Sequence, residues 1–240
     1  YGIYRNKSNI IAIFNEEEQI DETEEDAYIA VARTCFYAEQ GGQIYDTGMI
    51  VGKNFKARVL EVFKAPNGQH IHKVKLLAGT ISHNDECELI VDKDRRNKIE
   101  ANHSSVHILQ YALQQVVSDS IHQAGSYVDD ERLRFDFTYT GKMTDEKLLE
   151  VEKFANDMIN EDIIVSTEIM PLDKAKQLGA MALFNEKYGE TVRVVKIGKS
   201  IELCGGTHTA NTKNISSLAI YSCESKGSNV YRIEAATSDK

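Results

Sequence analysis

The segments His103-Ser-Ser-Val-His107 and Cys204-Gly-Gly-Thr-His208 decide how this chain must fold. Each carries two side chains that can bind a metal ion, four positions apart. On a helix of about 3.6 residues per turn such positions share one face, so the two histidines of the first segment can bind one ion together. The two glycines of the second segment permit a tight turn that brings its cysteine and histidine to the same point. Three imidazoles and a thiolate suit Zn²⁺. The predicted zinc ligands are His103, His107, Cys204 and His208.

The composition is that of a folded protein with one or two domains. Of 240 residues, 42% are hydrophobic and 27% are charged, which allows a sizeable core. No apolar run approaches the ~20 residues of a membrane span. The net charge of −9 argues against binding nucleic acid by bulk electrostatics, without excluding such a partner. Four widely spaced cysteines favour a reducing compartment, so we expect a cytoplasmic protein. Because the chain opens with Tyr1 and not Met, we expect a fragment of a larger protein.

Residues 1–92 predict a small β-barrel. Runs of β-branched and aromatic residues alternate with turn signals, and Pro66-Asn67-Gly68 predicts a hairpin. Several short strands with turns between them are typical of a barrel. The predicted strands are Ile10–Phe14, Tyr28–Phe36, Phe55–Phe63 and His70–Leu77.

A long helix is predicted next, capped by Asp92 or Asp94 and running to about Ser120. An apolar arc lies on one side, and a polar strip borders it. Such a strip indicates either a helix that lines a cleft or a boundary between core and solvent. A basic cluster near the helix start either contacts phosphate or forms a solvated face. The strip comprises His103, His107, Gln110 and Gln114, and the cluster comprises Arg95, Arg96 and Lys98.

Residues 93–240 as a whole predict an α+β core. A second helix is capped by Thr144 and runs to about Asn160, and Pro171 starts a short helix that Gly179 ends. Strands and helices are segregated, so the chain is predicted to be α+β, with an N-terminal β-barrel followed by a zinc-containing α+β core. The predicted strands of this part are Tyr127–Val128, Arg132–Thr138, Ile163–Met170, Thr191–Ile197, Ser217–Ser222 and Val230–Ala235.

Several common catalytic motifs are absent. The first metal segment has Ser104 where zinc proteases of the H-E-x-x-H type have a glutamate, and Gly198-Lys199-Ser200 lacks the upstream glycine of a phosphate loop, whose position Arg193 occupies. No G-x-S-x-G element is present. These absences argue against a zinc protease, against ATP chemistry within this chain and against a serine esterase.

A series of motifs covers the chain from roughly Ala30 to Thr237: Thr34-Cys-Phe-Tyr-Ala-Glu-Gln-Gly-Gly-Gln43, Asp46-Thr-Gly48, His103-Ser-Ser-Val-His107, Leu133-Arg-Phe-Asp136, Gly179-Ala-Met-Ala-Leu-Phe184, Glu186-Lys-Tyr188, Glu202-Leu-Cys-Gly-Gly-Thr-His208 and Arg232-Ile-Glu-Ala235. In this order they resemble the editing region of the alanyl-tRNA synthetases. Gln40 departs from that pattern, because many members have a glycine there.

The resemblance implies a barrel subdomain over residues 1–92 and a zinc-bearing editing core over residues 93–240. Related cores occur in threonyl-tRNA synthetase and in free-standing alanyl-tRNA editing proteins. The implied activity is hydrolysis of tRNA for alanine that has been wrongly charged with serine or glycine. The implied parent enzyme joins alanine to its tRNA with ATP, using an aminoacylation domain upstream and a C-terminal domain for oligomerisation and tRNA binding downstream.

Ester hydrolysis requires a positioned water and stabilisation of an oxyanion. Zinc with one loose ligand could activate water, whereas zinc with four protein ligands organises the pocket or anchors the substrate. Glu202 shares a strand face with the cysteine ligand and is either a partner of a ligand, a base, or a solvent-exposed carboxylate. Gln123, expected in the loop after the long helix, is either a surface amide or, by the resemblance, a partner for the serine hydroxyl.

The glycine-rich motif and the second metal segment supply the remaining predicted site residues. Gln43, with Gly41 and Gly42, is expected to border the entry of the terminal adenosine, because glycine lets backbone N–H groups approach a ligand closely. Thr207 is expected to bind substrate. Two other functions remain open, a free-standing trans-editing hydrolase and a non-catalytic tRNA-binding module in which zinc serves folding alone.

Overall fold

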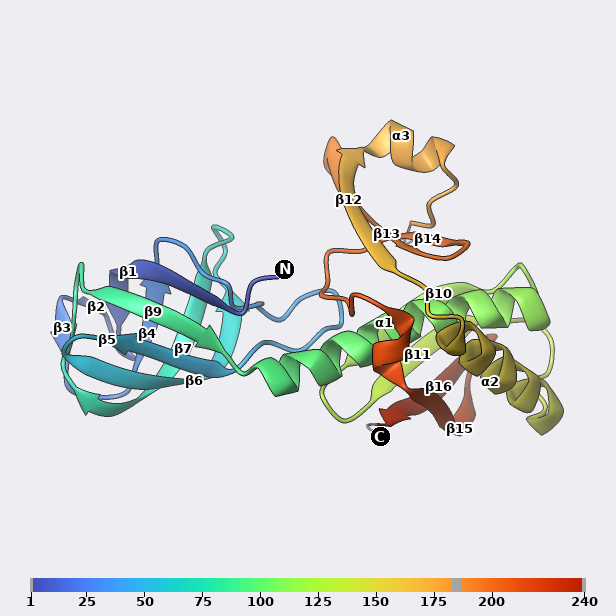
Figure 1. Ribbon diagram of the computed structural model, residues 1–240, viewed down its shortest axis with the longest axis horizontal. Coiled ribbons are helices and arrows are strands. Elements are labelled where there is room, and N and C mark those ends of the chain that lie inside the picture. Colours follow the sequence, from blue (N-terminus) through green and yellow to red (C-terminus); the bar gives the residue numbers. More distant parts are fainter. Residues whose placement is uncertain (1, 183–186, 239–240) are drawn as a thin grey trace. The chain divides into compact units, whose positions relative to one another are not determined.

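A computed structural model describes residues 2–182 and 187–238 (Figure 1). Its secondary structure is mostly β-strand, with few helices. The chain divides into two compact units, of which the first comprises Tyr1–Gln40 with Ile44–Arg96 and the second Gly41–Gln43 with Asn97–Lys240. None of the helices within the described ranges is both long and apolar enough to cross a bilayer.

Six described strands of the first unit build the predicted β-barrel, which is confirmed. The strand order is β1-β4-β7-β6-β5-β9, and antiparallel pairing of β9 with β1 closes the ring. Alternation along β6 places Phe55, Ala57 and Val59 in the barrel core and their neighbours outside. The strands are β1 (Arg5–Phe14), β2 (Gln19–Ile20), β3 (Glu22–Thr23), β4 (Ala27–Val31), β5 (Gly48–Gly52), β6 (Phe55–Lys64), β7 (His70–Gly79), β8 (Ile81–Ser82) and β9 (Glu86–Val91).

The predicted strand Tyr28–Phe36 is wrong in its second half, because β4 ends at Val31. The apolar residues that follow are buried without strand pairing, so their hydrophobicity reflects a position in the barrel core. Five described strands of this unit were also not predicted, and β5 and β9 are the longest of them. β5 is bounded by glycines and β9 contains two glutamates, and both residue types weaken a strand signal.

A buried ion pair in the first unit corrects the interpretation of the basic cluster. The Arg96 side chain is fully buried, and its guanidinium binds the carboxylate of Asp46, with Nε at 3.1 Å from Oδ2. It also donates to the carbonyls of Cys35 at 2.6 Å and Ile3 at 2.8 Å. Asp46 accepts in addition from the backbone N–H of Tyr37 at 2.7 Å. Arg96 is therefore neither a solvated charge nor a phosphate ligand.

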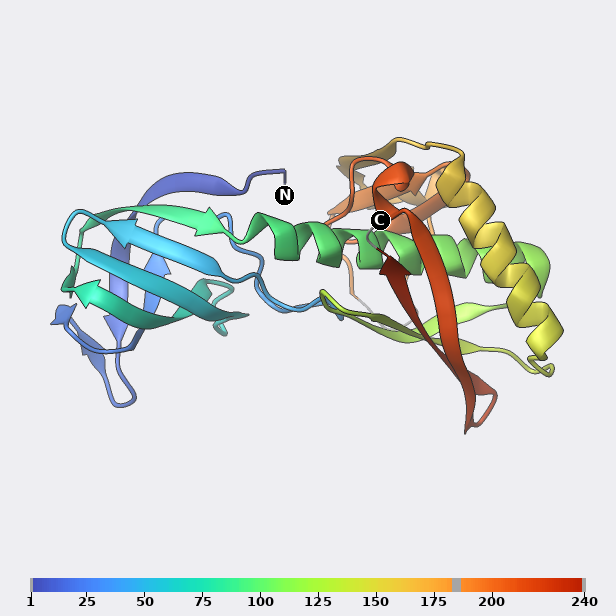
Figure 2. The same cartoon turned by 60° about the horizontal axis from the view of Figure 1, so that its bottom comes forward.

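Two helices pack against a four-stranded antiparallel sheet of order β10-β11-β16-β15 in the second unit. On α1, Asn102 accepts a hydrogen bond from Thr237 of β16 at 2.8 Å, and on α2, Asn156 bonds the backbone of Leu218 of β15. The long hairpin of β15 and β16 is the red ribbon of Figure 2. These elements are α1 (Lys93–Val116), α2 (Asp145–Asn160), β10 (His122–Val128), β11 (Leu133–Thr138), β15 (Ser217–Gly227) and β16 (Val230–Ser238).

A second sheet of the same unit carries Glu202, one of the predicted site residues. Its order is β12-β13-β14, and a short helix, α3, follows β12 directly. The strand β14 was not predicted, whereas the β13 range is confirmed. The elements are β12 (Val165–Pro171), α3 (Leu172–Gln177), β13 (Thr191–Ile197), β14 (Ser200–Leu203) and the 3₁₀ helix η1 (Thr212–Ile215).

The predicted caps agree with the helix starts, and the predicted end of α2 at Asn160 is confirmed. Asp92 accepts from the N–H of Arg95 at the start of α1, and Thr144 accepts from the N–H of Lys147 at the start of α2. Helix α1 stops before the expected Ser120, because Ser118 forms a local turn with the N–H of Ser120 instead. Positions 183, 184 and 186 of the resemblance motifs lie outside the described residues.

Candidate metal centre

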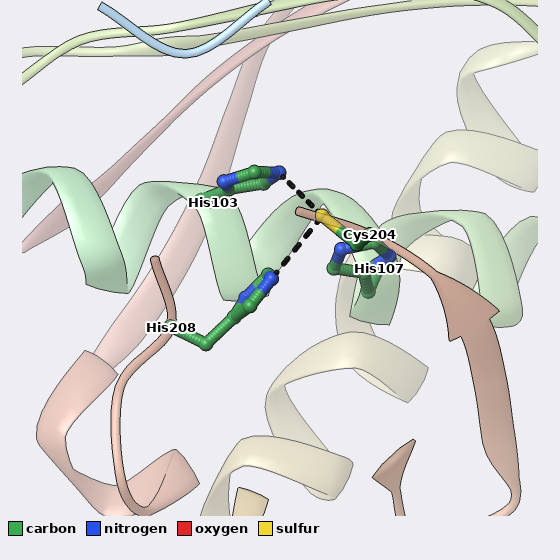
Figure 3. A group of neighbouring side chains, drawn as sticks. All are labelled: His103, His107, Cys204 and His208. Carbon is green, nitrogen blue, oxygen red and sulfur yellow. Dashed lines mark hydrogen bonds between the residues drawn. The ribbon is translucent and has the colours of Figure 1, made fainter. Parts of the chain in front are cut away.

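Four side chains from two distant segments converge in the second unit (Figure 3). His103 and His107 come from one face of α1, while Cys204 and His208 come from the loop that follows β14. The ligand atoms all lie within 4.8 Å of one another. The sulfur of Cys204 lies 3.4 Å from Nε2 of His103 and 3.3 Å from Nε2 of His208. This arrangement can hold a metal ion.

The two glycines of the loop have different roles, and neither is the predicted one. Neither Gly205 nor Gly206 has a positive φ, so the turn itself does not demand glycine. A Cβ atom on Gly206 would lie 2.0 Å from Cε1 of His103, whereas one on Gly205 would meet no atom within 4 Å. Gly206 is therefore required because the imidazole ring packs directly on the backbone.

In each of the three histidines Nε2 faces the cluster, and Nδ1 forms a hydrogen bond with a side chain outside the ligand set. Nδ1 of His103 bonds Oε1 of Gln43 at 2.7 Å, and Nδ1 of His107 bonds the carboxylate of Glu202. Nδ1 of His208 lies 3.1 Å from the hydroxyl of Ser104. Partners of this kind orient a ligand ring and fix which nitrogen carries the proton.

Gln43 is fixed in turn by Thr207. Its Nε2 donates to the Thr207 hydroxyl at 2.7 Å, while its Oε1 accepts from the Thr207 N–H at 2.9 Å as well as from His103. Gln43 is 1% exposed and Thr207 is fully buried. Both residues thus lie where they orient His103. The contacts of Gln43 with adenosine and of Thr207 with substrate stay predictions.

The charges of the cluster favour a thiolate. Burial alone would raise the pKa of Cys204, but the surrounding histidines His103, His208 and His107 hold it well below the ordinary 9.0. Burial opposes protonation of His107, yet the Glu202 carboxylate and the Cys204 thiolate outweigh it and raise the pKa of His107 to about 10. Burial lowers the pKa of His208 to about 3. A thiolate is the form of cysteine that binds metals.

One orphaned atom supports the fit of a metal ion to these residues. Nε2 of His107 is buried and has no hydrogen-bond partner among the described residues, although Nδ1 of the same ring is bonded. Buried polar atoms are nearly always paired, so an unpaired nitrogen beside a thiolate and two further imidazoles fits a metal ion as its partner.

The glycine-rich segment lies against β10. Gly42 has a φ of +83°, and a Cβ there would come within 2.4 Å of the Ser126 carbonyl oxygen, so only glycine fits. The carbonyl of Gly42 accepts from the N–H of Val128 at 2.7 Å, and Gly41 also has a positive φ of +58°. This segment brings the next residue, Gln43, to the metal cluster.

Gln123 lies on β10 and not in the predicted loop. The strand signal is weak because the stretch from His122 to Ser126 contains no β-branched or bulky apolar residue. Nε2 of Gln123 donates to the hydroxyl of Ser126 at 2.9 Å. Gln123 is therefore connected to the glycine-rich segment through Ser126 and is not itself hydrogen-bonded to a metal ligand among the described residues.

Two residues of the centre were not identified from the sequence. Ser104, besides facing His208, accepts from the N–H of Thr209 at 3.1 Å. Arg193 of β13 donates to the carbonyl of Cys204 at 3.3 Å and to that of Gly206, so it braces the ligand loop. The helical position of Ser104 between two ligands was an available signal. No sequence signal identified Arg193, because its contacts depend on the pairing of β13 with β14.

Glu202→Gln is expected to lower metal affinity about 10- to 100-fold. The amide keeps an acceptor for His107 but removes the negative charge that raises the basicity of the ring. Competition with a chromophoric chelator measures the affinity, and Glu168→Gln, an exposed position on β12, is the matched control. An unchanged affinity in Glu202→Gln would show that the carboxylate does not support the metal site.

Comparison with known proteins places these features in a family context. Residues 1–95 match the model of class II (A) tRNA synthetases, and residues 192–234 match the model of the second additional domain of threonyl- and alanyl-tRNA synthetases. The second match contains Glu202, Cys204 and His208, and therefore half of the metal cluster.

The full sequence is similar to several alanine–tRNA ligases. That of Staphylococcus saprophyticus is 45% identical over 99% of this chain and 27% of its own length. Those of Halalkalibacterium halodurans and Lysinibacillus sphaericus are each 47% identical, over 89% and 92% of this chain and 24% of their own lengths. The chain thus spans about a quarter of the length of these relatives. It is a relative of the alanine–tRNA ligases, corresponding to the segment that carries their second additional domain, as the ordered motifs predicted.

Proposed function

We propose that this chain is the editing part of an alanine–tRNA ligase, and that it hydrolyses the ester of tRNA for alanine mischarged with serine or glycine. The observation that carries the proposal is the buried cluster of three imidazoles and one cysteine, each imidazole held at its outer nitrogen, in a chain related to alanine–tRNA ligases. The parent protein would attach alanine to its tRNA with ATP through domains that precede and follow this part.

Zinc is the metal that we assign to the cluster. A ligand set of three nitrogens and one sulfur suits it better than magnesium or calcium, which prefer oxygen. His103, His107, Cys204 and His208 would hold the ion, which would supply positive charge to polarise or anchor the ester. Glu202 is already bonded to His107, so we assign it the orientation of that ring and not the activation of water.

The amino-acid selectivity follows from the hydroxyl of serine. Alanine differs from serine by one oxygen, so size alone discriminates weakly. A pocket that hydrogen-bonds the hydroxyl leaves its own polar groups unpaired when alanine enters, which costs binding energy. The Gln123 amide, held by Ser126, both donates and accepts and suits this role. Glycine is smaller than serine and is not excluded by size. It also lacks the hydroxyl, so this contact separates serine from alanine and does not select glycine.

Deacylation of the alanine tRNA charged with serine, with glycine or with alanine tests the proposal. We expect hydrolysis of the first two esters and protection of the third. Gln123→Ala should slow the hydrolysis of seryl-tRNA and keep the thermal midpoint of unfolding within a few degrees. Binding of the tRNA without hydrolysis of any ester would instead support a recognition module in which the metal serves folding alone. Equal hydrolysis of all three esters would contradict an editing function.

A further inference from the structure

A second orphaned atom lies one helical turn beyond the metal ligand His107. Oε1 of Gln110 is buried and has no hydrogen-bond partner among the described residues, and Gln110 as a whole is 3% exposed. Residues three positions apart on a helix are neighbours on one face, separated by ~4.5 Å along the axis. A metal ion accounts for the free nitrogen of His107. It does not account for the amide oxygen, because the four-ligand set is complete without it.

The other end of the Gln110 amide is already occupied. Its Nε2 faces the sulfur of Met181 at 3.8 Å, a weak acceptor that suits an N–H donor and not a carbonyl oxygen. The backbone of Met181 is itself fixed, since its N–H donates to Ile201 and its carbonyl accepts from Leu203, both at 2.9 Å. The amide is thereby oriented, and the end left free is an acceptor.

This acceptor belongs to the neighbourhood of the metal centre. Met181 pairs in a β-bridge with Glu202, the residue whose carboxylate holds His107. The Gln110 side chain therefore extends from α1 to the segment of Met181, one helical turn from the ligand His107, and is buried. An unpaired acceptor in such a place lowers the stability of the fold unless a ligand supplies the missing donor.

We propose that Oε1 of Gln110 binds the α-ammonium group of the aminoacyl ester, an inference that rests on the proposed editing function. An ammonium group offers three N–H donors and no acceptor, which matches an oxygen that can only accept. The ammonium group is present in seryl and glycyl esters alike. It is bonded to the α-carbon, which is next to the ester carbonyl. Gln110 thus recognises what the two substrates share, whereas the serine hydroxyl is left to Gln123.

Three esters of the alanine tRNA test this assignment in the wild-type chain and in Gln110→Leu: seryl, glycyl and 3-hydroxypropionyl, which is serine without its amino group. The wild type should hydrolyse the 3-hydroxypropionyl ester about 10- to 100-fold more slowly than the seryl ester. In Gln110→Leu the seryl and glycyl rates should fall by a similar factor, and the 3-hydroxypropionyl rate should stay the same. A loss confined to the seryl ester, or the same discrimination in both proteins, would overturn the assignment.

Thermal unfolding separates binding from a structural role. Leucine has a similar volume to glutamine but lacks the unpaired oxygen. The unfolding midpoint of Gln110→Leu should therefore be equal to that of the wild type or higher. A lower midpoint would overturn the assignment. Gln114→Leu, on the next turn, is the matched control. Its Nε2 donates to the carbonyl of Ile121 at 2.9 Å and faces the Met181 sulfur at 3.3 Å, so this variant should be less stable. Because it keeps the Gln110 oxygen, it should not change the relative rates of the three esters. If the wild type hydrolyses none of the esters, the editing function fails and the Gln110 assignment fails with it.

Discussion

Cys204→Ala is expected to abolish hydrolysis of seryl-tRNA and to lower metal affinity by more than about 100-fold. The substitution removes the only anionic ligand of the cluster and the charge toward which two of the imidazoles point. Partners outside the ligand set already contribute about 10- to 100-fold to affinity in such sites, so loss of a ligand should exceed that range. Metal content after dialysis and the deacylation rate measure the two effects.

The control for this variant is Cys223→Ala, a half-buried thiol on β15. Burial raises the pKa of Cys223 to about 11, which keeps it a neutral thiol, and it lies outside the metal cluster. We expect this variant to keep its metal and its deacylation rate. A Cys204→Ala protein that retains both would refute the metal assignment and the catalytic one together.

Asp46→Ala should destabilise the first unit by about 3–5 kcal/mol, because it leaves a buried guanidinium without its counter-charge. Arg96 is fully buried, and its contacts with the carbonyls of Ile3 and Cys35 and with the Tyr4 ring do not replace the carboxylate charge. The N–H of Tyr37 also loses its acceptor. Urea unfolding, monitored by circular dichroism of the β-strands, measures the change in the free energy of unfolding.

The double variant Asp46→Leu with Arg96→Met is the informative companion. Replacing both members of a buried pair by apolar residues is often neutral or stabilising, since no charge is left unpaired. We therefore expect this variant to be much more stable than Asp46→Ala. If Asp46→Ala unfolds within about 1 kcal/mol of the wild type, the Arg96 charge is not as isolated from water as its burial indicates.

Local rules explain which parts of the fold could be predicted from the sequence. The i, i+4 spacing of His103 and His107 and the cap at Thr144 depend on helix geometry alone, and both agree with the structure. The barrel followed from several short strands with turn signals. By contrast, the end of β4 and the start of β10 depend on pairing with distant residues, which no local pattern contains.

The supports of the metal site illustrate the same limit. The motif resemblance indicated that Gln43, Glu202 and the four cluster residues belong to one site, but the side-chain pairs could not be predicted. Gln43 pairs with a histidine 60 positions away and Glu202 with one 95 positions away. Arg96 was grouped with its charged neighbours for the same reason, since its partner Asp46 is 50 positions away.

The distances along the chain between these partners also constrain the order of events during synthesis. Gln43 leaves the ribosome 60 positions ahead of its partner His103 on α1, whereas Cys204 follows His103 by 101 positions. Contacts that close such long loops form late, because each must overcome a large loss of chain entropy. The nascent chain can complete its barrel and α1 while the metal centre still lacks half of its ligands. Closure of the centre is thus confined to the time after His208 has been translated, when most of this chain has already had the opportunity to fold.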